Sequence, residues 1–256
     1  MINPVSIKSL CGEAYQARPD LLSGRTILVT GAGDGIGKEL AMNAAKHGAN
    51  LVLLGRTQAK LEAIYDQIES ETGTLPVICP VDLETLDDEQ AKVIAGSIAD
   101  TCGQLDALVH NAGVLGQRTP IQNYSTKAWQ SVMQININAG FILSKALIPL
   151  MTASNDARIL FTSSGVGRVG KAFWGAYAVS KFATEGLAQM LAEELTNVSN
   201  IRVNAINPGA TRTSMRASAF PAENPESLRT AAELIPGYLY LLGPDSSEVN
   251  GQSIDL

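Results

Sequence analysis

The sequence predicts one α/β domain, a doubly wound parallel β-sheet with helices on both faces. Three observations predict this class. Short apolar runs alternate along the chain with longer stretches of helical spacing, which is the order that builds βαβ units. The strand runs are apolar throughout, as in a sheet whose two faces are both covered. The length of 256 residues suits one large domain, because no repeat or low-complexity linker divides the chain.

Each element in the first half has a local reason. The first strand is predicted at 26–30 (TILVT), where β-branched residues end at a glycine cluster. Helical spacing follows in KELAMNAAKHG and ends at Gly48, a glycine C-cap. The run NLVLLG (50–55) predicts the second strand, the polar stretch 58–72 the next helix, and LPVICPV (75–81) the third strand.

The second half continues the same alternation. Helices are predicted at about 85–102, 126–151, 175–196 and 226–242, and strands at 105–110 (LDALVH), 157–163 (ARILFTS), 201–207 (IRVNAIN) and 251–256 (GQSIDL). Residues 1–23 are expected to be a loosely structured lead-in to a domain that spans 24–256. The segment 214–228 contains two prolines and follows a strand's carboxyl end, so it is either a plain loop or a lid over a pocket.

Composition excludes several classes of protein. The chain is 45% hydrophobic and 17% charged, with a mean hydropathy of +0.08, which disfavours disorder. The formal net charge of −6 argues against general affinity for nucleic acid or for an anionic membrane. The most apolar stretch, FILSKALIPLM, is short and contains Lys145, so no membrane span is expected. The N-terminus lacks the apolar core of a secretory signal.

Cysteine and histidine usage predicts neither a disulfide framework nor a metal site. Cys11, Cys79 and Cys102 are odd in number, far apart and without a CxxC pair. His47 and His110 are isolated, and His110 at the end of an apolar strand is expected to be a satisfied core residue. A reducing cytoplasm is therefore the expected location.

A glycine-rich loop joins the first strand to the first helix. The stretch VTGAGDGIGKEL reads T-G-x-x-x-G-x-G, with Thr30, Gly31, Gly35 and Gly37. A tight turn alone needs fewer glycines, so the loop predicts backbone that approaches a pyrophosphate at a helix N-terminus. The same loop contains the G-x-G-x-G of methyltransferases. That alternative is weakened because Val29 and Gly55 stand roughly where those proteins place acids.

The end of the second strand favours NADP(H) over NAD. An NAD enzyme usually places a carboxylate there for the ribose 2′-hydroxyl. This chain has Gly55 and then Arg56, whose guanidinium suits a phosphate, although an exposed arginine at a strand end needs no such role. Asp34 within the glycine loop argues the other way, because its carboxylate would repel a 2′-phosphate.

Together these motifs resemble the short-chain dehydrogenase/reductase family, and within it the YciK-type oxidoreductases. The match runs from about residue 24 onward and includes TGAGDGIG, VDL, NAG, ININAG, FTSSG, YAVSK and NPGATRTSM. The resemblance implies a Rossmann-type fold, no metal, and catalytic residues Asn136, Ser164, Tyr177 and Lys181. It implies cofactor contacts from Gly31, Asp34, Gly35, Ile36, Gly37, Arg56, Asp82, Leu83, Asn111, Ala112, Gly113, Tyr177, Lys181, Pro208, Gly209, Thr211 and Thr213.

These residues predict reduction of a carbonyl, a ketone or aldehyde with 3-oxoacyl compounds among them, by hydride transfer from NADPH. Tyr177 would donate the proton and Ser164, preferred to Ser163 by its interval to Tyr177, would bind the substrate oxygen. Lys181 lies one helical turn from Tyr177. Two charges about 4 Å apart interact by about 4 kcal/mol, so Lys181 with an oxidised nicotinamide is expected to lower the Tyr177 pKa from about 10 towards about 7. Asn136 would hold a proton-relaying water.

The substrate and the assembly are less determined. Phe173 and Trp174 either wall an apolar pocket or belong to the core. Four cations are expected near the mouth, for an acidic group or an acyl carrier or as plain surface: Arg168, Lys171, Arg212 and Arg216. The resemblance implies a homodimer or homotetramer through the two long helices. An NAD-linked alcohol dehydrogenase and a non-catalytic NADP-sensing protein are the alternative functions.

Overall fold

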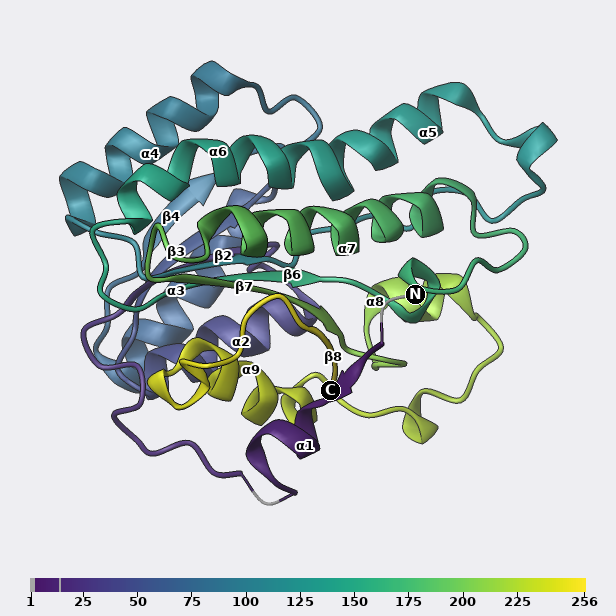
Figure 1. The fold of residues 1–256 in the computed structure, drawn as a ribbon. Helices are drawn as coiled ribbons and strands as arrows, with labels where there is room; N and C mark the ends of the chain where they lie inside the picture. Colours follow the sequence, from purple (N-terminus) through teal and green to yellow (C-terminus); the bar gives the residue numbers. More distant parts are fainter. Residues whose placement is uncertain (1–2, 14) are drawn as a thin grey trace.

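A parallel β-sheet forms the middle layer of the molecule (Figure 1). The computed structural model describes residues 3–13 and 15–256, and within them the sheet has eight strands in the order β1-β8-β7-β6-β5-β2-β3-β4. Their bounds are β1 Val5–Ser6, β2 Thr26–Thr30, β3 Asn50–Gly55, β4 Val77–Pro80, β5 Ala107–His110, β6 Ala157–Thr162, β7 Ile201–Asn207 and β8 Ser253–Asp255. Every neighbouring pair is parallel, which confirms the predicted fold class.

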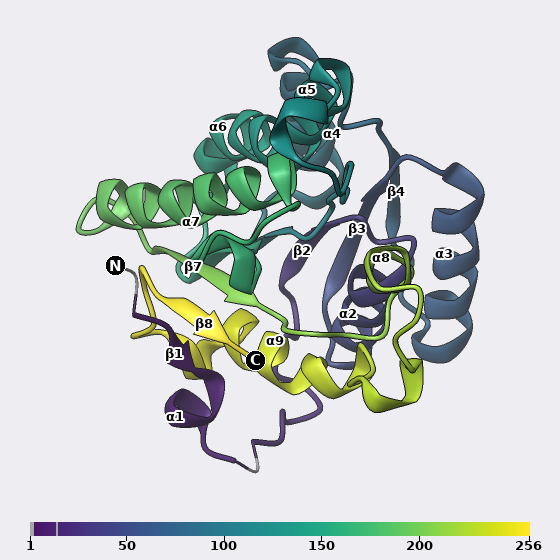
Figure 2. The same ribbon diagram turned by 90° about the vertical axis from the view of Figure 1, so that its right-hand side faces the viewer.

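Helices cover both faces of this sheet, as Figures 1 and 2 show from two sides. One face carries α1 (Ile7–Cys11), α2 (Gly35–Lys46), α3 (Gln58–Thr72) and α9 (Ile235–Leu242), and the other carries α4 (Asp88–Cys102), α5 (Thr126–Met133), α6 (Ala139–Met151) and α7 (Gly175–Leu195). Successive strand residues point to opposite faces, so Ile27 and Val29 join one apolar core and Leu28 joins the other. Both cores are built from the apolar runs that predicted the strands.

The helix predicted at 126–151 is continuous but changes its pitch. A π-helical turn at Gln134–Asn138 separates α5 from α6. By length and composition alone the helix Thr126–Met151 could cross a membrane, since an 18-residue window in it has a mean hydropathy of 1.2, whereas no membrane span was expected. Leu143, Leu147 and Met151 are fully buried in the core that α4 and the sheet share. The run is therefore a covering helix of the sheet in this structure.

The expectation of a loose lead-in is wrong for Val5–Cys11. β1 extends the sheet by pairing with β8, Val5 opposite Ile254 and Ser6 opposite Asp255, and Figure 2 shows the two strands side by side at one edge. Ile7 of α1 is buried against the core that contains α9. Two paired residues are too few to give a periodic signal. Backbone hydrogen bonds to the free edge of β8 order them instead.

The helix predicted at 226–242 is wrong over its first half. Short 3₁₀ turns occupy Pro225–Ser227 and Ala232–Leu234, and the α-helix begins only at Ile235. Pro236 lacks an N–H and fits the first turn of a helix but not its interior, which explains the late start. The segment 214–228 opens with α8 (Ser214–Ala219), whose N-terminus the Thr213 hydroxyl caps.

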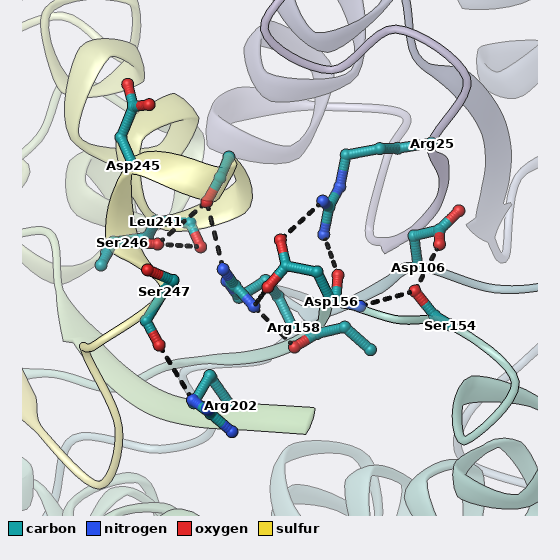
Figure 3. Close-up of polar contacts among 12 residues, drawn as sticks. Arg25, Asp106, Ser154, Asp156, Arg158, Arg202, Leu241, Asp245, Ser246 and Ser247 are labelled. Atoms are coloured by element: carbon teal, nitrogen blue, oxygen red, sulfur yellow. Dashed lines mark hydrogen bonds and ion pairs between the residues drawn. The ribbon is translucent and has the colours of Figure 1, made fainter. Parts of the chain in front are cut away.

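A polar network ties the amino ends of three strands together (Figure 3). The Asp156 carboxylate pairs with Arg25 at 2.9 Å and with Arg158, which is completely buried within a strand predicted to be apolar. The buried Asp106 carboxylate accepts hydrogen bonds from the Ser154 hydroxyl at 2.6 Å and from the Thr26 N–H at 2.8 Å. The network lies at the end of the sheet away from the strand termini that carry the predicted site.

Candidate active site

A cleft of about 620 Å³ opens along the carboxyl ends of the strands. Ligands bind at this edge in doubly wound sheets. The cleft is lined by the predicted site residues Gly31, Asp34, Gly35, Ile36, Arg56, Asp82, Leu83, Asn111, Ala112, Gly113, Ser164, Tyr177, Lys181, Pro208, Gly209, Thr211 and Thr213. Gly37 and Asn136 do not line it. Gly37 packs beneath the glycine loop, and Asn136 lines a small adjoining cavity behind Lys181.

The glycine loop is folded too tightly for a side chain at Gly37. A Cβ atom there would lie 2.3 Å from the Gly31 carbonyl oxygen and 2.6 Å from the Asn111 amide nitrogen. Such contacts are far below van der Waals distance, so the loop keeps this path only with glycine. The resulting cradle of backbone at the start of α2 fits the pyrophosphate of a dinucleotide.

Asp34 is paired in a way that the sequence did not suggest. Its carboxylate caps the Gly35 N–H at 2.7 Å and forms an ion pair with Lys60 of α3 at 2.9 Å. The Lys60 ammonium holds the pKa of the Asp34 carboxyl below its ordinary value. The expected repulsion of a 2′-phosphate by Asp34 is therefore offset by Lys60, which lines the cleft near Arg56.

The NAG turn after β5 is bound to the end of β2 through Thr30. The Thr30 hydroxyl accepts hydrogen bonds from the N–H groups of Asn111 and Ala112, each at 3.0 Å, and donates one to the Val109 carbonyl at 3.2 Å. The Asn111 side chain donates to the Thr30 carbonyl at 3.2 Å. One threonine thus fixes the turn between two strands, and the turn walls the cleft.

Asn136 lies in the π-helical turn and is almost fully buried. Its amide nitrogen donates to the Val114 carbonyl and to the Ser180 hydroxyl, each at 3.0 Å, and its amide oxygen accepts from the Val114 N–H at 2.8 Å. The turn aims this side chain between the NAG segment and α7. π-Helical turns are frequent at functional sites.

Ser164, Tyr177 and Lys181 meet at the bottom of the cleft. The Ser164 hydroxyl lies beside the Tyr177 phenol and acts to lower its pKa. The Lys181 ammonium donates to the Thr162 carbonyl at 2.7 Å and lies 5.6 Å from the centre of the Tyr177 ring. Ser163 also lines the cleft, but its buried hydroxyl has no partner among the residues described. Ser164 rather than Ser163 therefore lies beside the phenol, and its role in binding a substrate stays a prediction.

The expected lowering of the Tyr177 pKa, which includes an oxidised nicotinamide, stays a prediction; within the protein itself the shift has the opposite direction. Burial raises the pKa of the Tyr177 phenol, and the neighbouring Ser164 hydroxyl offsets part of this rise. Burial also lowers the pKa of Lys181 to about 8, against the opposing effect of the Glu185 carboxylate. The Lys181 ammonium is directed at the Thr162 carbonyl, so burial rather than the neighbouring cation dominates the Tyr177 titration.

Aromatic and cationic side chains stack at the mouth of the cleft. The Trp174 ring lies 5.7 Å from Tyr177 and 5.9 Å from Phe220, measured between ring centres. The Arg118 guanidinium lies over both Trp174 and Phe220, at 4.7 and 4.8 Å, and donates to the Ala219 carbonyl. The Arg216 guanidinium covers Phe220 at 3.9 Å. These contacts hold α8 and the Phe220 that follows it at the mouth of the cleft.

Several residues expected near the mouth point elsewhere. Phe173 is exposed and adopts a positive φ of 70°, and Arg212 donates to the Pro225 carbonyl. Arg168 is bound to Glu185 below the cleft, and Lys171 does not line it. The sequence missed Lys60 because Asp34, its partner, lies 26 positions away, and missed Arg118 and Phe220 because only the folded loops bring them to Trp174.

The histidines and acids form no metal cluster within the part of the chain that the structure describes. His110 is buried, bonds the Ser144 hydroxyl at 2.9 Å and stacks on Phe161, which confirms its interpretation as a satisfied core residue. Burial lowers its pKa to about 3, so it is neutral.

Comparison with known proteins shows the family to which this fold is related. The family described as short chain dehydrogenase matches residues 25–224. The oxidoreductase YciK of Escherichia coli (strain K12) is 50% identical over 241 residues, which cover 94% of this chain and 95% of that protein. A short chain dehydrogenase from Pseudomonas syringae has a TM-score of 0.93 at 51% identity, covering 94% of this chain and 98% of its own. One from Escherichia coli CFT073 complexed with NADPH has a TM-score of 0.91 at 50% identity, covering 93% and 98%.

Proposed function

The chain belongs to the short-chain dehydrogenase family, and from that premise we propose that it reduces a carbonyl compound to an alcohol with NADPH. The observation that supports this most directly is the placement of the Ser164 hydroxyl beside the Tyr177 phenol in the cleft, with Lys181 one helical turn further along α7. NADPH supplies the hydride when it is bound. The protein must then bind the carbonyl oxygen, stabilise the charge that develops on it and deliver a proton.

Tyr177 is the proton donor in this proposal. Burial raises its pKa, so the phenol carries its proton at neutral pH and can donate it. The Ser164 hydroxyl lies beside the phenol, where it donates a second hydrogen bond to the substrate oxygen. Two donors at one oxygen stabilise the developing alkoxide, and Tyr177 then transfers its proton to it.

Lys181 and Asn136 act behind Tyr177. The Lys181 charge lies close enough to the phenol to stabilise a transient tyrosinate, and its ammonium is held by the Thr162 carbonyl. The Asn136 amide oxygen accepts one hydrogen bond from Val114 and keeps a second lone pair for the water proposed to return a proton. The protein residues thus hold the reactants and move one proton.

The cofactor assignment to NADP(H) depends on the cations at the adenosine end of the cleft. Arg56 and Lys60 both line this end, and Lys60 compensates the charge of Asp34. A guanidinium and an ammonium together suit a 2′-phosphate. The NADPH complex of the similar dehydrogenase supports the same choice.

The substrate is proposed to be an apolar carbonyl compound. Leu115, Trp174 and Met215 pack together beside Tyr177 and wall the inner end of the cleft. Of the four cations expected near the mouth, Arg216 is the one that lines the cleft. Its guanidinium is paired with the Glu223 carboxylate through two hydrogen bonds of 2.6 Å. An acidic substrate group would have to compete with that carboxylate, so 3-oxoacyl esters or simple ketones fit better than free acids.

Replacement of the phenol tests the proposal. Tyr177→Phe keeps the ring but removes the proton, so NADPH-dependent reduction of ketones, diketones and aldehydes should fall at least about a hundredfold. NADPH binding, followed by fluorescence, should remain. Tyr65→Phe on α3 is the matched control and should keep full activity.

Full activity of Tyr177→Phe would contradict the proton-donor role. A wild-type protein that binds NADPH but turns over none of these carbonyls would favour the NADP-sensing alternative. Faster NAD-linked oxidation of alcohols would favour the dehydrogenase. Thermal stabilisation by S-adenosylmethionine but not by NADPH would revive the methyltransferase.

We further propose that the protein works as a homodimer or homotetramer through α6 and α7. These helices expose four large apolar side chains, Phe141, Val179, Phe182 and Met190, each 43–50% exposed. Large apolar groups on neighbouring helices are typical of a subunit interface. The three cysteines are free thiols, which fits a reducing compartment such as the cytoplasm.

A further inference from the structure

Arg168 and Glu185 form a buried ion pair behind the proposed catalytic residues. Arg168 follows Ser164 by four residues, and Glu185 follows Lys181 by four residues on the next turn of α7. The Arg168 Nε atom lies 3.3 Å from Glu185 Oε1, and their side chains are 9% and 1% exposed. The pair therefore joins the segment that carries Ser164 to the helix that carries Tyr177 and Lys181.

Two residues of strand β8 bind this ion pair. The Ser253 hydroxyl accepts a hydrogen bond from Arg168 Nε at 2.9 Å and donates one to Glu185 Oε2 at 2.6 Å. Asp255 binds Arg168 Nη1 at 2.6 Å and is held in turn by the Asn207 amide at 2.8 Å. We call these four residues, Arg168, Glu185, Ser253 and Asp255, the β8 clasp.

The segment between Ser164 and Arg168 is seated directly on Lys181. The Gly167 N–H donates to the Ser164 carbonyl at 2.8 Å. A Cβ atom on Gly167 would lie 2.8 Å from the Lys181 carbonyl oxygen and 2.9 Å from the Lys181 Cβ atom. With no space between them, a displacement of Arg168 would be passed on to both Ser164 and Lys181.

Glu185 is also the source of negative charge for Lys181. The other titratable groups that face this part of the site are neutral or cationic at neutral pH: Tyr177 on α7, His110 on β5, Tyr238 on α9, which reaches the Thr162 hydroxyl, and Arg168. The Asp255 carboxylate already accepts hydrogen bonds from Arg168 and Asn207. Glu185 opposes the effect of burial, which lowers the Lys181 pKa to about 8.

We propose that the β8 clasp is a positioning device, in which Arg168 and Ser253 fix Ser164 against Lys181 while the Glu185 charge keeps Lys181 protonated. This inference rests on the proposed function, because it assigns the clasp to the residues that would perform the reduction. Neither Arg168 nor Glu185 lies in the cleft itself, so both act through their neighbours.

Glu185→Gln removes the charge and keeps one oxygen to accept from Arg168. Its amide nitrogen replaces the oxygen that accepts from Ser253 and can donate to that hydroxyl instead. Without the carboxylate the Lys181 pKa falls further below its ordinary value, so Lys181 loses its proton at a lower pH. The alkaline limb of kcat for carbonyl reduction should therefore move down by about one pH unit, since charges one helical turn apart interact by about that much once Arg168 offsets part of it. Glu194→Gln, exposed on the same helix, is the matched control.

Ser253→Ala tests the positioning effect apart from the charge effect of Glu185. It removes both hydrogen bonds of the hydroxyl and leaves every charge in place. Its kcat should fall about fivefold with the alkaline limb unmoved. The inference is overturned if the alkaline limb of kcat does not move in Glu185→Gln, or if it moves equally in Glu194→Gln. It is also overturned if kcat is unchanged in Ser253→Ala. If Glu185→Gln does not fold, the kcat of Ser253→Ala by itself decides whether the inference holds.

Tyr177→Phe measured alongside keeps this inference distinct from the proposed function. An active Tyr177→Phe refutes the proposed function whatever the clasp variants do. An inactive Tyr177→Phe with an unshifted Glu185→Gln refutes the clasp alone. A thermal melt identifies effects that are only structural: in Glu185→Gln these would lower the melting temperature and leave the pH profile unchanged, and in Ser253→Ala they would lower the melting temperature without lowering kcat per folded molecule.

Discussion

At the scale of single residues, burial acts in opposite directions on the two titratable groups of the cleft. It raises the pKa of the Tyr177 phenol and lowers that of the Lys181 ammonium to about 8. Both changes favour the neutral form, since a low-dielectric surrounding disfavours either charge. Near neutral pH the phenol keeps its proton and the lysine remains mostly charged, which is the combination that carbonyl reduction requires.

Arg56 provides a residue-scale test of the cofactor. Arg56→Ala removes a charge-assisted contact to a 2′-phosphate, so the Kd for NADPH should rise about tenfold. The Kd for NADH should not change, because NADH lacks that phosphate. Titration of both dinucleotides by fluorescence measures this, with NADH as the internal control. Equal weakening of both, or tighter binding of NADH than NADPH by the native protein, would contradict the role given to Arg56.

At the scale of elements, helix boundaries follow local chemistry more closely than hydrophobic pattern. α4 begins at Asp88 rather than at the predicted 85 because Asp87 forms a capping box with Gln90. The Asp87 carboxylate accepts from the Gln90 N–H at 2.8 Å, and the Gln90 side chain accepts from the Asp87 N–H at 3.2 Å. Two N–H groups that the helix cannot pair are thus satisfied at its first residues.

Removal of this cap should cost stability without touching the cleft. Asp87→Ala is expected to lower the free energy of unfolding by about 1 kcal/mol. Urea denaturation measures the change. The control is Asp100→Ala, near the carboxyl end of the same helix, where a negative charge opposes the helix dipole and its removal should not destabilise. Equal losses in the two variants would mean that the cap contributes nothing specific.

At the scale of the whole molecule, the sheet joins the two ends of the chain. β1 and β8 lie side by side at one edge, and β8 supplies Ser253 and Asp255 to the clasp behind Lys181. The proposed catalytic residues therefore depend on strand pairing that the last residues of the chain complete. In the same layered architecture α6 and α7 lie on one side of the sheet (Figure 1), and both expose large apolar side chains.

A charge on that face should dissociate the proposed oligomer. Phe182→Glu would bury an unpaired carboxylate between subunits, so the particle mass by light scattering should fall from that of a dimer or tetramer towards that of a monomer. Val93→Glu introduces the same charge at an exposed site on α4 and is the control. The interface would be wrongly placed if Phe182→Glu kept the native mass, or if Val93→Glu dissociated equally.

The sequence by itself determined the alternation of strands and helices, the parallel sheet and, apart from Gly37 and Asn136, the placement of the predicted site residues along the cleft. These features depend on local periodicity and on motifs at strand ends. The tertiary structure alone decided four features: the pairing of β1 with β8, the Asp34–Lys60 ion pair, the stack of Arg118 on Trp174 and Phe220, and the rise of the Tyr177 pKa. Each depends on groups far apart in the chain or on burial. Contacts between distant groups and burial produce no periodic pattern in the sequence. Only the packed fold sets which side chains meet and how much water remains around them.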